Sequence, residues 1–201
     1  MTLNDRSTPL SLLETRRSGR PREMVAPGPS EAELERILTI AARSPDHGKL
    51  TPWRFVTVAP AQRDALADLL ALALPECVTD AGPAHFQKAH EFAHQAPSLV
   101  VLVSAPVPNH KIPLWEQQLS VGAAGMNLLS AAHTLGYVGG WITSWAAYSE
   151  RVRAAFCAPG ERIAGFMFLG SPGAELQERP RPSLEAVARA WVAPGRNPQQ
   201  S

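Results

Sequence analysis

The stretch QQLSVGAAGMNLLSAAHTLGYVGGWITSWAAYS, residues 117–149, contains no Asp, Glu, Lys or Arg. A membrane span needs about 20 continuous apolar residues, whereas this stretch carries several Gln, Asn and Ser side chains and is broken by glycines. It therefore predicts a long buried helix near Trp115–Leu135, followed by a strand at Val138–Thr143. A helix with so few charged positions offers little surface to water, so we expect a second copy of the chain to cover part of it, with Gly122 and Gly125 allowing close approach.

Helix and strand patterns alternate outward from this stretch. Ser30 and Glu33 have the spacing of a capping box, and apolar residues follow at helical intervals, which predicts a helix over Ser30–Arg43. The apolar run Leu99–Val103 predicts a central strand. The other expected elements are helices at Pro9–Thr15, Ala61–Leu72, Ala84–Gln95 and Ser149–Phe156, strands at Arg54–Val58 and Ile163–Gly170, and a turn at Pro75–Gly82. Without a repeat or a linker, this pattern predicts one α+β domain over residues 1–201, a sandwich around one sheet.

Composition excludes several classes of protein. The chain of 201 residues is 45% apolar and 18% charged, as expected for a globular domain, and its formal net charge of +1 gives no basic field for nucleic acid or an anionic membrane. The two cysteines, Cys77 and Cys157, are too few for a disulfide framework and fit a reducing compartment. The first residues lack the apolar segment of an export signal. We therefore expect a cytoplasmic location.

One short motif suggests a metal. His90, Glu91 and His94 match H-E-x-x-H, in which two histidines one helical turn apart bind zinc beside a glutamate base. Against this reading, Lys88 lies one turn earlier and would oppose a metal ion. The motif therefore predicts an exposed polar helix face and no metal, with a zinc hydrolase kept as an alternative. The candidates for a third zinc ligand are His110 and Glu116.

Four other segments carry groups suited to a ligand. Arg16, Arg17 and Ser18 combine guanidinium forks with a hydroxyl, which match the oxygens of a phosphate, although arginine clusters are also common on solvated surfaces. The loop Arg43–Trp53 is fixed by prolines and carries cationic side chains suited to an anionic planar ligand. The glycines of Gly136–Ser144 predict either a close approach to a ligand or tight strand packing. In the tail, prolines flank Arg181.

In this order, the segments resemble the nitroreductase family of flavin enzymes, in particular its short YdjA-type branch. The resemblance spans nearly the whole chain. The matching segments are ETRRSGR at 14–20, ARSPDHGKLTPWRFV at 42–56, KIPLWEQQLSVGAAGMNLLSAAHTLGYVGGWITS at 111–144 and IAGFMFLGSP at 163–172.

The resemblance implies a nitroreductase-like α/β sandwich with a mixed, mainly antiparallel sheet, and a homodimer built on the long central helix with FMN at each interface. It implies hydride transfer from NADH or NADPH through flavin N5 to a nitroaromatic, a quinone or a similar acceptor in ping-pong turnover, with no catalytic side chain and no metal. A non-catalytic flavin-binding module is the other alternative. The cofactor-binding residues implied are Arg16, Arg17, Ser18, Arg43, His47, Lys49, Thr51, Trp141, Ile142, Thr143 and Arg181. The NAD(P)-binding residues implied are Ala131, Ala132, His133, Thr134, Leu135 and Gly136.

The chain departs from the family pattern in the proline-bracketed loop. Thr51 stands where many members have Gln, and Lys49 where they have Asn. A Gln amide both donates and accepts hydrogen bonds, whereas Lys only donates, so we expect altered redox tuning of the flavin. The segment Leu72–Ala89 is the least family-like, and such segments tend to cover the substrate pocket in this fold.

Overall fold

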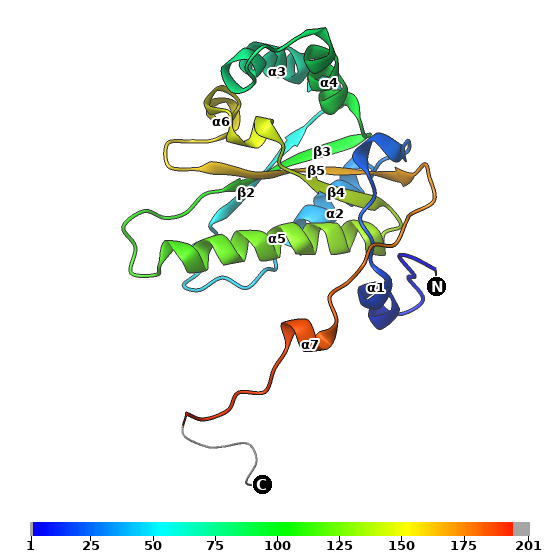
Figure 1. The fold of residues 1–201 in the computed structure, drawn as a ribbon, viewed down its shortest axis with the longest axis vertical. Helices are drawn as coiled ribbons and strands as arrows, with labels where there is room; N and C mark the ends of the chain where they lie inside the picture. Colours follow the sequence, from blue (N-terminus) through cyan, green and yellow to red (C-terminus); the bar gives the residue numbers. More distant parts are fainter. Residues whose placement is uncertain (1, 195–201) are drawn as a thin grey trace.

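A five-stranded sheet separates two layers of helices in the computed structural model of the chain, which describes residues 2–194 (Figure 1). The central strands are β3 and β5: β3 pairs with β2 and β5, while β5 also pairs with β4 and, at its end, with β1. All of these pairings are antiparallel, so the mixed character expected of the sheet is not seen within residues 2–194. The strands are β1 (Met24–Val25), β2 (Trp53–Val58), β3 (Ser98–Ser104), β4 (Val138–Ile142) and β5 (Arg162–Pro172).

The helices divide between the two faces of the sheet. In Figure 1, α3, α4 and α6 lie on one side, and α2 and α5 on the other. Successive side chains of a strand point to opposite faces, so Val101 and Phe168 pack with the first group while Val100 and Met167 pack with the second. The helices are α1 (Pro9–Thr15), α2 (Glu31–Ala41), α3 (Arg63–Cys77), α4 (Pro83–His94), α5 (Leu114–Thr134), α6 (Glu150–Phe156) and α7 (Leu184–Val187), with short 3-10 turns η1 (Pro21–Glu23), η2 (Pro60–Gln62) and η3 (Trp145–Tyr148).

This architecture confirms the expected α+β fold, and the capping box at Ser30 is formed as predicted. The turn predicted at Pro75–Gly82 is wrong at its start, because Pro75 lies inside α3, which continues to Cys77. A proline this close to a helix end removes only one hydrogen bond, and the burial of Ala73 and Leu74 favours continuing the helix.

The long helix α5 packs its glycines differently from expectation. A Cβ atom on Gly125 would lie 2.5 Å from Cζ3 of Trp141 and 2.9 Å from Cδ2 of Leu102, so Gly125 makes room for its own sheet and not for a second copy. Gly122, by contrast, has no neighbour within 4 Å of the same position. Only Gly122 therefore remains available for the close approach that the sequence predicts.

No helix within residues 2–194 is both long enough and apolar enough to cross a bilayer. This agrees with the expectation for the uncharged stretch, since α5 contains buried polar side chains such as Gln117 and His133.

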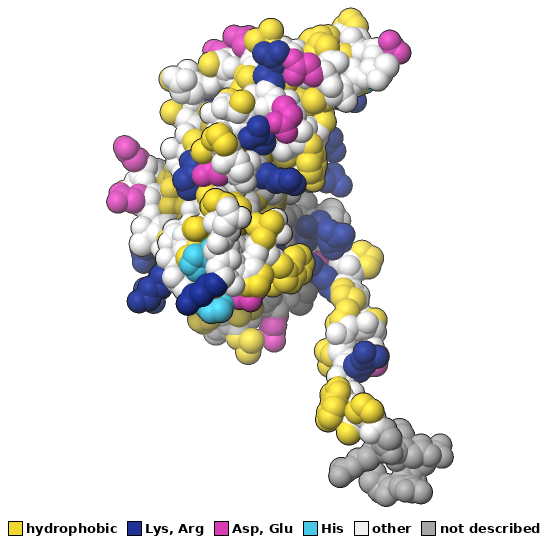
Figure 2. All heavy atoms as spheres, turned by 90° about the vertical axis from the view of Figure 1, so that its left-hand side faces the viewer, with side chains coloured by type: hydrophobic (Ala, Val, Ile, Leu, Met, Phe, Trp, Pro, Cys, Tyr) yellow, Lys and Arg dark blue, Asp and Glu magenta, His cyan; other side chains and the backbone are white. Residues whose placement is uncertain are grey.

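Beyond β5 the chain leaves the body of the molecule. The C-terminal arm, residues 182–194, includes α7 and extends away from the sheet (Figures 1 and 2). Leu184 and Trp191 on this arm are 72% and 82% exposed. An arm with large exposed apolar side chains has a surface suited to another chain.

Candidate functional site

The arginine segment lies directly against the glycines of β4. The helix α1 begins at its N-cap Thr8, whose hydroxyl accepts a hydrogen bond from the Ser11 amide, and it ends at Arg16. The chain then runs along β4, where the Gly19 amide donates to the Gly139 carbonyl at 3.2 Å. A Cβ atom on Gly140 would lie 3.0 Å from the Gly19 carbonyl oxygen. The two glycines thus allow this close approach, which favours the tight-packing explanation of the Gly136–Ser144 segment.

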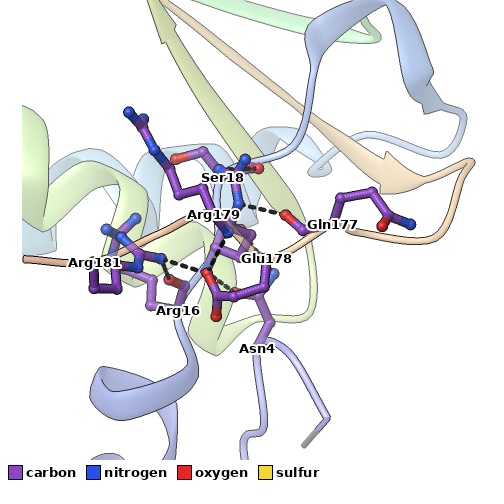
Figure 3. Close-up of polar contacts among 8 residues, drawn as sticks. Asn4, Arg16, Ser18, Gln177, Glu178, Arg179 and Arg181 are labelled. Atoms are coloured by element: carbon purple, nitrogen blue, oxygen red, sulfur yellow. Dashed lines mark hydrogen bonds and ion pairs between the residues drawn. The ribbon is translucent and has the colours of Figure 1, made fainter.

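Cationic side chains from the two ends of the chain meet here (Figure 3). The Arg181 guanidinium donates to the Arg16 carbonyl at 3.2 Å and also pairs with Glu178 at 3.1 Å. The Arg17 side chain donates to the carbonyls of Gln177 and Ser18 at 2.7 and 3.1 Å. These bonds hold the C-terminal segment against the arginine segment.

Arg16 differs from the other two arginines of this cluster, whose guanidinium groups donate to backbone carbonyls. Within residues 2–194, neither its guanidinium nor the Ser18 hydroxyl has a hydrogen-bonding partner. Burial lowers the pKa of the Arg16 guanidinium, and the positive charges of Arg181 and Arg17 lower it further. We call Arg16, Arg17, Ser18 and Arg181 the arginine cluster. Its positive charges are partly desolvated and repel one another, and a bound anion would offset both effects.

Two residues that position the cluster were missed by the sequence analysis. The Asn4 side chain accepts from the Arg17 amide at 2.7 Å and donates to the Arg17 carbonyl at 3.1 Å, so it fixes the backbone of the arginine segment. Gln177 contributes only its backbone carbonyl. Neither contact has a recognisable sequence pattern, because one joins an N-terminal stretch of polar residues to a backbone and the other does not depend on the side chain.

A buried histidine lies beneath the cluster. His133 is fully buried in the last turn of α5, where its Nε2 accepts from the Gly139 amide at 3.2 Å, and its Nδ1 has no partner among residues 2–194. Burial lowers the pKa of His133 to about 4, and the nearby charge of Arg16 acts in the same direction. The imidazole is therefore neutral at neutral pH.

This histidine predicts a pH-dependent stability. Between the ordinary pKa of 6.5 and the folded value of about 4, the unfolded chain binds the proton and the folded chain does not. The free energy of unfolding should therefore fall as the pH is lowered through this range, by about 3 kcal/mol in total from this residue. Urea unfolding of the wild type and of His133→Gln, which keeps an acceptor for the Gly139 amide, measures the difference. Parallel pH profiles for the two proteins would contradict the assignment.

The proline-bracketed loop, residues 43–53, lies along α5 between Asn127 and the first turn of the helix. The His47 Nδ1 contacts the Glu116 carboxylate at 2.6 Å, in the first turn of α5, and Asn127 donates to the Ser44 hydroxyl at 2.9 Å. The Asp46 carboxylate accepts from the Thr51 amide at 2.7 Å and stabilises a loop with positive φ angles of 57° at Lys49 and 49° at Thr51. The side chains of the four cofactor-binding candidates in this loop are exposed: Arg43, His47, Lys49 and Thr51.

The His47 end of the loop and the arginine cluster lie far apart within one chain. His47 contacts α5 at Glu116, whereas Arg16 lies near His133, and an α-helix rises 1.5 Å per residue, so these two positions on α5 are separated by about 25 Å. In a twofold dimer with antiparallel α5 helices, the start of one helix would face the end of the other.

The third group of candidates lies at the end of β4. Trp141, Ile142 and Thr143 are half-buried. The Trp141 indole donates to the Ala164 carbonyl at 2.9 Å and fills the space above Gly125 and Gly165. This ring therefore has a packing role inside the chain, whatever else contacts its exposed edge.

The segment expected to bind NAD(P)H is only partly accessible. The side chains of Ala131, Ala132 and His133 are buried. The accessible part is Thr134, Leu135 and Gly136. Gly136, with a φ of +98°, borders a cavity of about 530 Å³ that is also lined by Asn4, Arg6 and His133.

The H-E-x-x-H motif is on an exposed face of α4, as the sequence analysis expects. The two candidates for a third zinc ligand have other partners: Glu116 contacts His47, and the His110 Nδ1 accepts from the Ile112 amide. The Glu91 carboxylate accepts from Gln87. The cavity of about 270 Å³ between α3, α4 and η3 is lined by none of the three motif residues. This geometry gives no support to a zinc hydrolase.

Comparison with known proteins identifies the fold and the family. The sequence profile of the Nitroreductase family matches residues 13–171. A candidate NAD(P)H nitroreductase of Haemophilus influenzae is 37% identical over 172 residues, covering 85% of this chain and 91% of the relative. The candidate NAD(P)H nitroreductase YdjA of Escherichia coli is 33% identical over 164 residues, covering 81% and 87%.

Comparison with solved structures gives the same fold. A nitroreductase-like protein of Bacillus cereus superposes with a TM-score of 0.78 at 17% identity, covering 93% of this chain and 97% of that one. The FMN-dependent nitroreductase NfnB of Mycobacterium smegmatis, in complex with NADPH, gives 0.69 at 17% identity, covering 91% and 97%. The order of the motifs, the antiparallel sheet and these matches lead to one conclusion: the chain belongs to the nitroreductase family.

Proposed function

We propose that this protein is an FMN-dependent NAD(P)H oxidoreductase that reduces nitroaromatic, quinone or similar acceptors in ping-pong turnover. The names of its relatives and the FMN and NADPH of the NfnB structure support this proposal. The free cysteines Cys77 and Cys157 fit a reducing cytoplasm. Residues 1–201 are proposed to form one functional domain.

The arginine cluster carries the proposal. FMN ends in a phosphate monoester, and guanidinium forks bind such a group through charge-assisted, bidentate hydrogen bonds. Arg16 has unused donors beside the free Ser18 hydroxyl. Burial and the neighbouring positive charges lower the pKa of Arg16, and a bound phosphate would offset both effects. The residues present therefore fit the phosphate end of this cofactor.

A homodimer would complete the site. Trp115 and Leu119 on α5 are 67% and 54% exposed, and half-buried Gly122 and Met126 continue the same face at helical spacing. We call this the α5 apolar face. Covering it with the α5 of a second copy would also bring the partner's proline-bracketed loop toward the arginine cluster, and the apolar side chains of the C-terminal arm would gain a surface to pack on.

In the assembled site, each group of residues has a defined task. Arg16, Arg17, Ser18 and Arg181 hold the phosphate, while Arg43, His47, Lys49 and Thr51 supply donors from the other chain. Trp141, Ile142 and Thr143 border the ring system. Thr134, Leu135 and Gly136 are the accessible part of the proposed NAD(P)H segment. FMN held by these residues would supply the hydride-transfer chemistry between NAD(P)H and the acceptor, and the cationic donors around it would stabilise the negative charge that develops on reduction.

The absorption spectrum of freshly purified protein tests this function. We expect a yellow protein whose visible bands bleach on adding NADH or NADPH without oxygen, and recover on adding a nitroaromatic or a quinone. Steady-state rates at several acceptor concentrations should give parallel double-reciprocal lines, as ping-pong turnover requires. A colourless protein that does not take up FMN would overturn the proposal, and a yellow protein that NAD(P)H cannot bleach would indicate a flavin-binding module.

A further inference from the structure

Three potential metal ligands converge on the surface where α3 packs against α4. Asp64 lies in the first turn of α3, and His90 and His94 lie one turn apart near the end of α4. One ligand atom from each side chain lies within 4.8 Å of the other two, and the His94 Nε2 is 2.9 Å from the Asp64 carboxylate. Asp64 comes from a different helix and belongs to no sequence motif, so its place beside the two histidines is evident only in the fold.

The hydrogen bonds of His94 leave a place for a cation. Its Nδ1 lies 3.0 Å from the His90 carbonyl oxygen, an acceptor, and its Nε2 faces the Asp64 carboxylate, also an acceptor. A neutral imidazole has only one N–H, so it cannot donate to both. With the proton on Nδ1, the Nε2 lone pair would face a carboxylate, and this contact is favourable only with a second proton or a metal ion between the two atoms. A backbone carbonyl that fixes Nδ1–H is also the usual outer support of a metal-bound histidine.

The neighbouring charges are directed away from this cluster. Lys88 lines the cavity between α3, α4 and η3. The Arg63 guanidinium is buried and donates to the carbonyls of Val58 and Ala93. Glu91 is held by Gln87. The two histidine rings are stacked with centroids 4.5 Å apart, so both sit on one face of α4 beside Asp64.

We propose that Asp64, His90 and His94 form a surface site for a divalent transition-metal ion such as Zn²⁺, which bridges α3 and α4. Two imidazole nitrogens and one carboxylate oxygen are a donor set that zinc accepts, with water completing the coordination. We assign the site a structural role, because Glu91 is hydrogen-bonded to Gln87 and none of the motif residues lines the 270 Å³ cavity. The helices it joins form two walls of the 270 Å³ cavity, so a bound ion would stiffen those walls.

Calorimetric titration with ZnCl₂ tests the site. The full-length protein, free of any affinity tag, is dialysed against a chelator and then against buffer. We expect one ion per chain, and a loss of affinity of at least about tenfold in Asp64→Asn and in His94→Gln, because even outer-shell changes cost 10–100-fold. Zinc should raise the melting temperature of the wild type and leave that of His94→Gln unchanged.

The matched control is His110→Gln, since His110 is also exposed and lies outside the cluster. It should bind zinc as the wild type does. All of the substituted side chains are exposed, and circular dichroism checks that each variant is folded. Equal zinc affinity in the wild type, Asp64→Asn and His94→Gln, or the absence of stoichiometric binding by the wild type, would overturn the proposal.

Discussion

Replacing Arg16 with alanine should lower the FMN content of the purified protein and weaken FMN binding by about 10- to 100-fold. The estimate follows from a hydrogen bond between charged groups, which contributes about 1.5–3 kcal/mol, at about 1.4 kcal/mol per tenfold. Arg16 is singled out because its guanidinium is partly buried and has no partner among residues 2–194, whereas Arg17 and Arg181 already donate to carbonyls. Fluorescence quenching of added FMN measures the affinity.

Two further variants make this prediction specific. Arg20→Ala removes a nearby arginine that pairs with Glu23 on the surface, and should leave FMN affinity unchanged. Arg16→Ala combined with Ser18→Ala should bind FMN more weakly than the single variant. Wild-type flavin content in the double variant would show that the phosphate binds elsewhere.

The elements that the sequence predicts well are those whose stability is local or periodic. Ser30 and Glu33 begin α2 because their reciprocal bonds need only residues three apart. The run Leu99–Val103 gives a strand buried on both faces because every one of its side chains is apolar. Arg16, Arg17 and Ser18 are adjacent in the sequence, so their proximity is evident from the sequence, and phosphate binding by them stays a prediction.

Contacts between distant segments were not predictable from single residues. Gly125 packs against Trp141 of its own chain, and nothing in the helix pattern distinguishes it from the open Gly122. Asn4 supports Arg17 through the backbone. The burial of His133 shows the same limit, because its contact with the Gly139 amide joins α5 to β4 and depends on the fold.

Replacing Leu119 with glutamate should convert the proposed dimer into monomers and abolish FMN binding. Leu119 is 54% exposed at the centre of the α5 apolar face, so the single chain should tolerate the change. In a twofold interface each copy would bury an unpaired carboxylate, at a cost of about 3–5 kcal/mol for each charge. Even one such cost weakens association more than about a hundredfold. Sedimentation velocity gives the oligomeric state, and the visible spectrum gives the flavin content.

The two readouts should change together, because His47 of the loop lies about 25 Å along α5 from the residues beside Arg16, and the proposed second copy would bring its own His47 toward the arginine cluster. Leu72→Glu is the matched control: Leu72 is 65% exposed on α3, away from α5, and its variant should remain dimeric and yellow. A monomeric Leu119→Glu protein with full flavin content would show that one chain holds the cofactor alone. A dimer that survives the substitution would place the subunit contact on another face of the molecule.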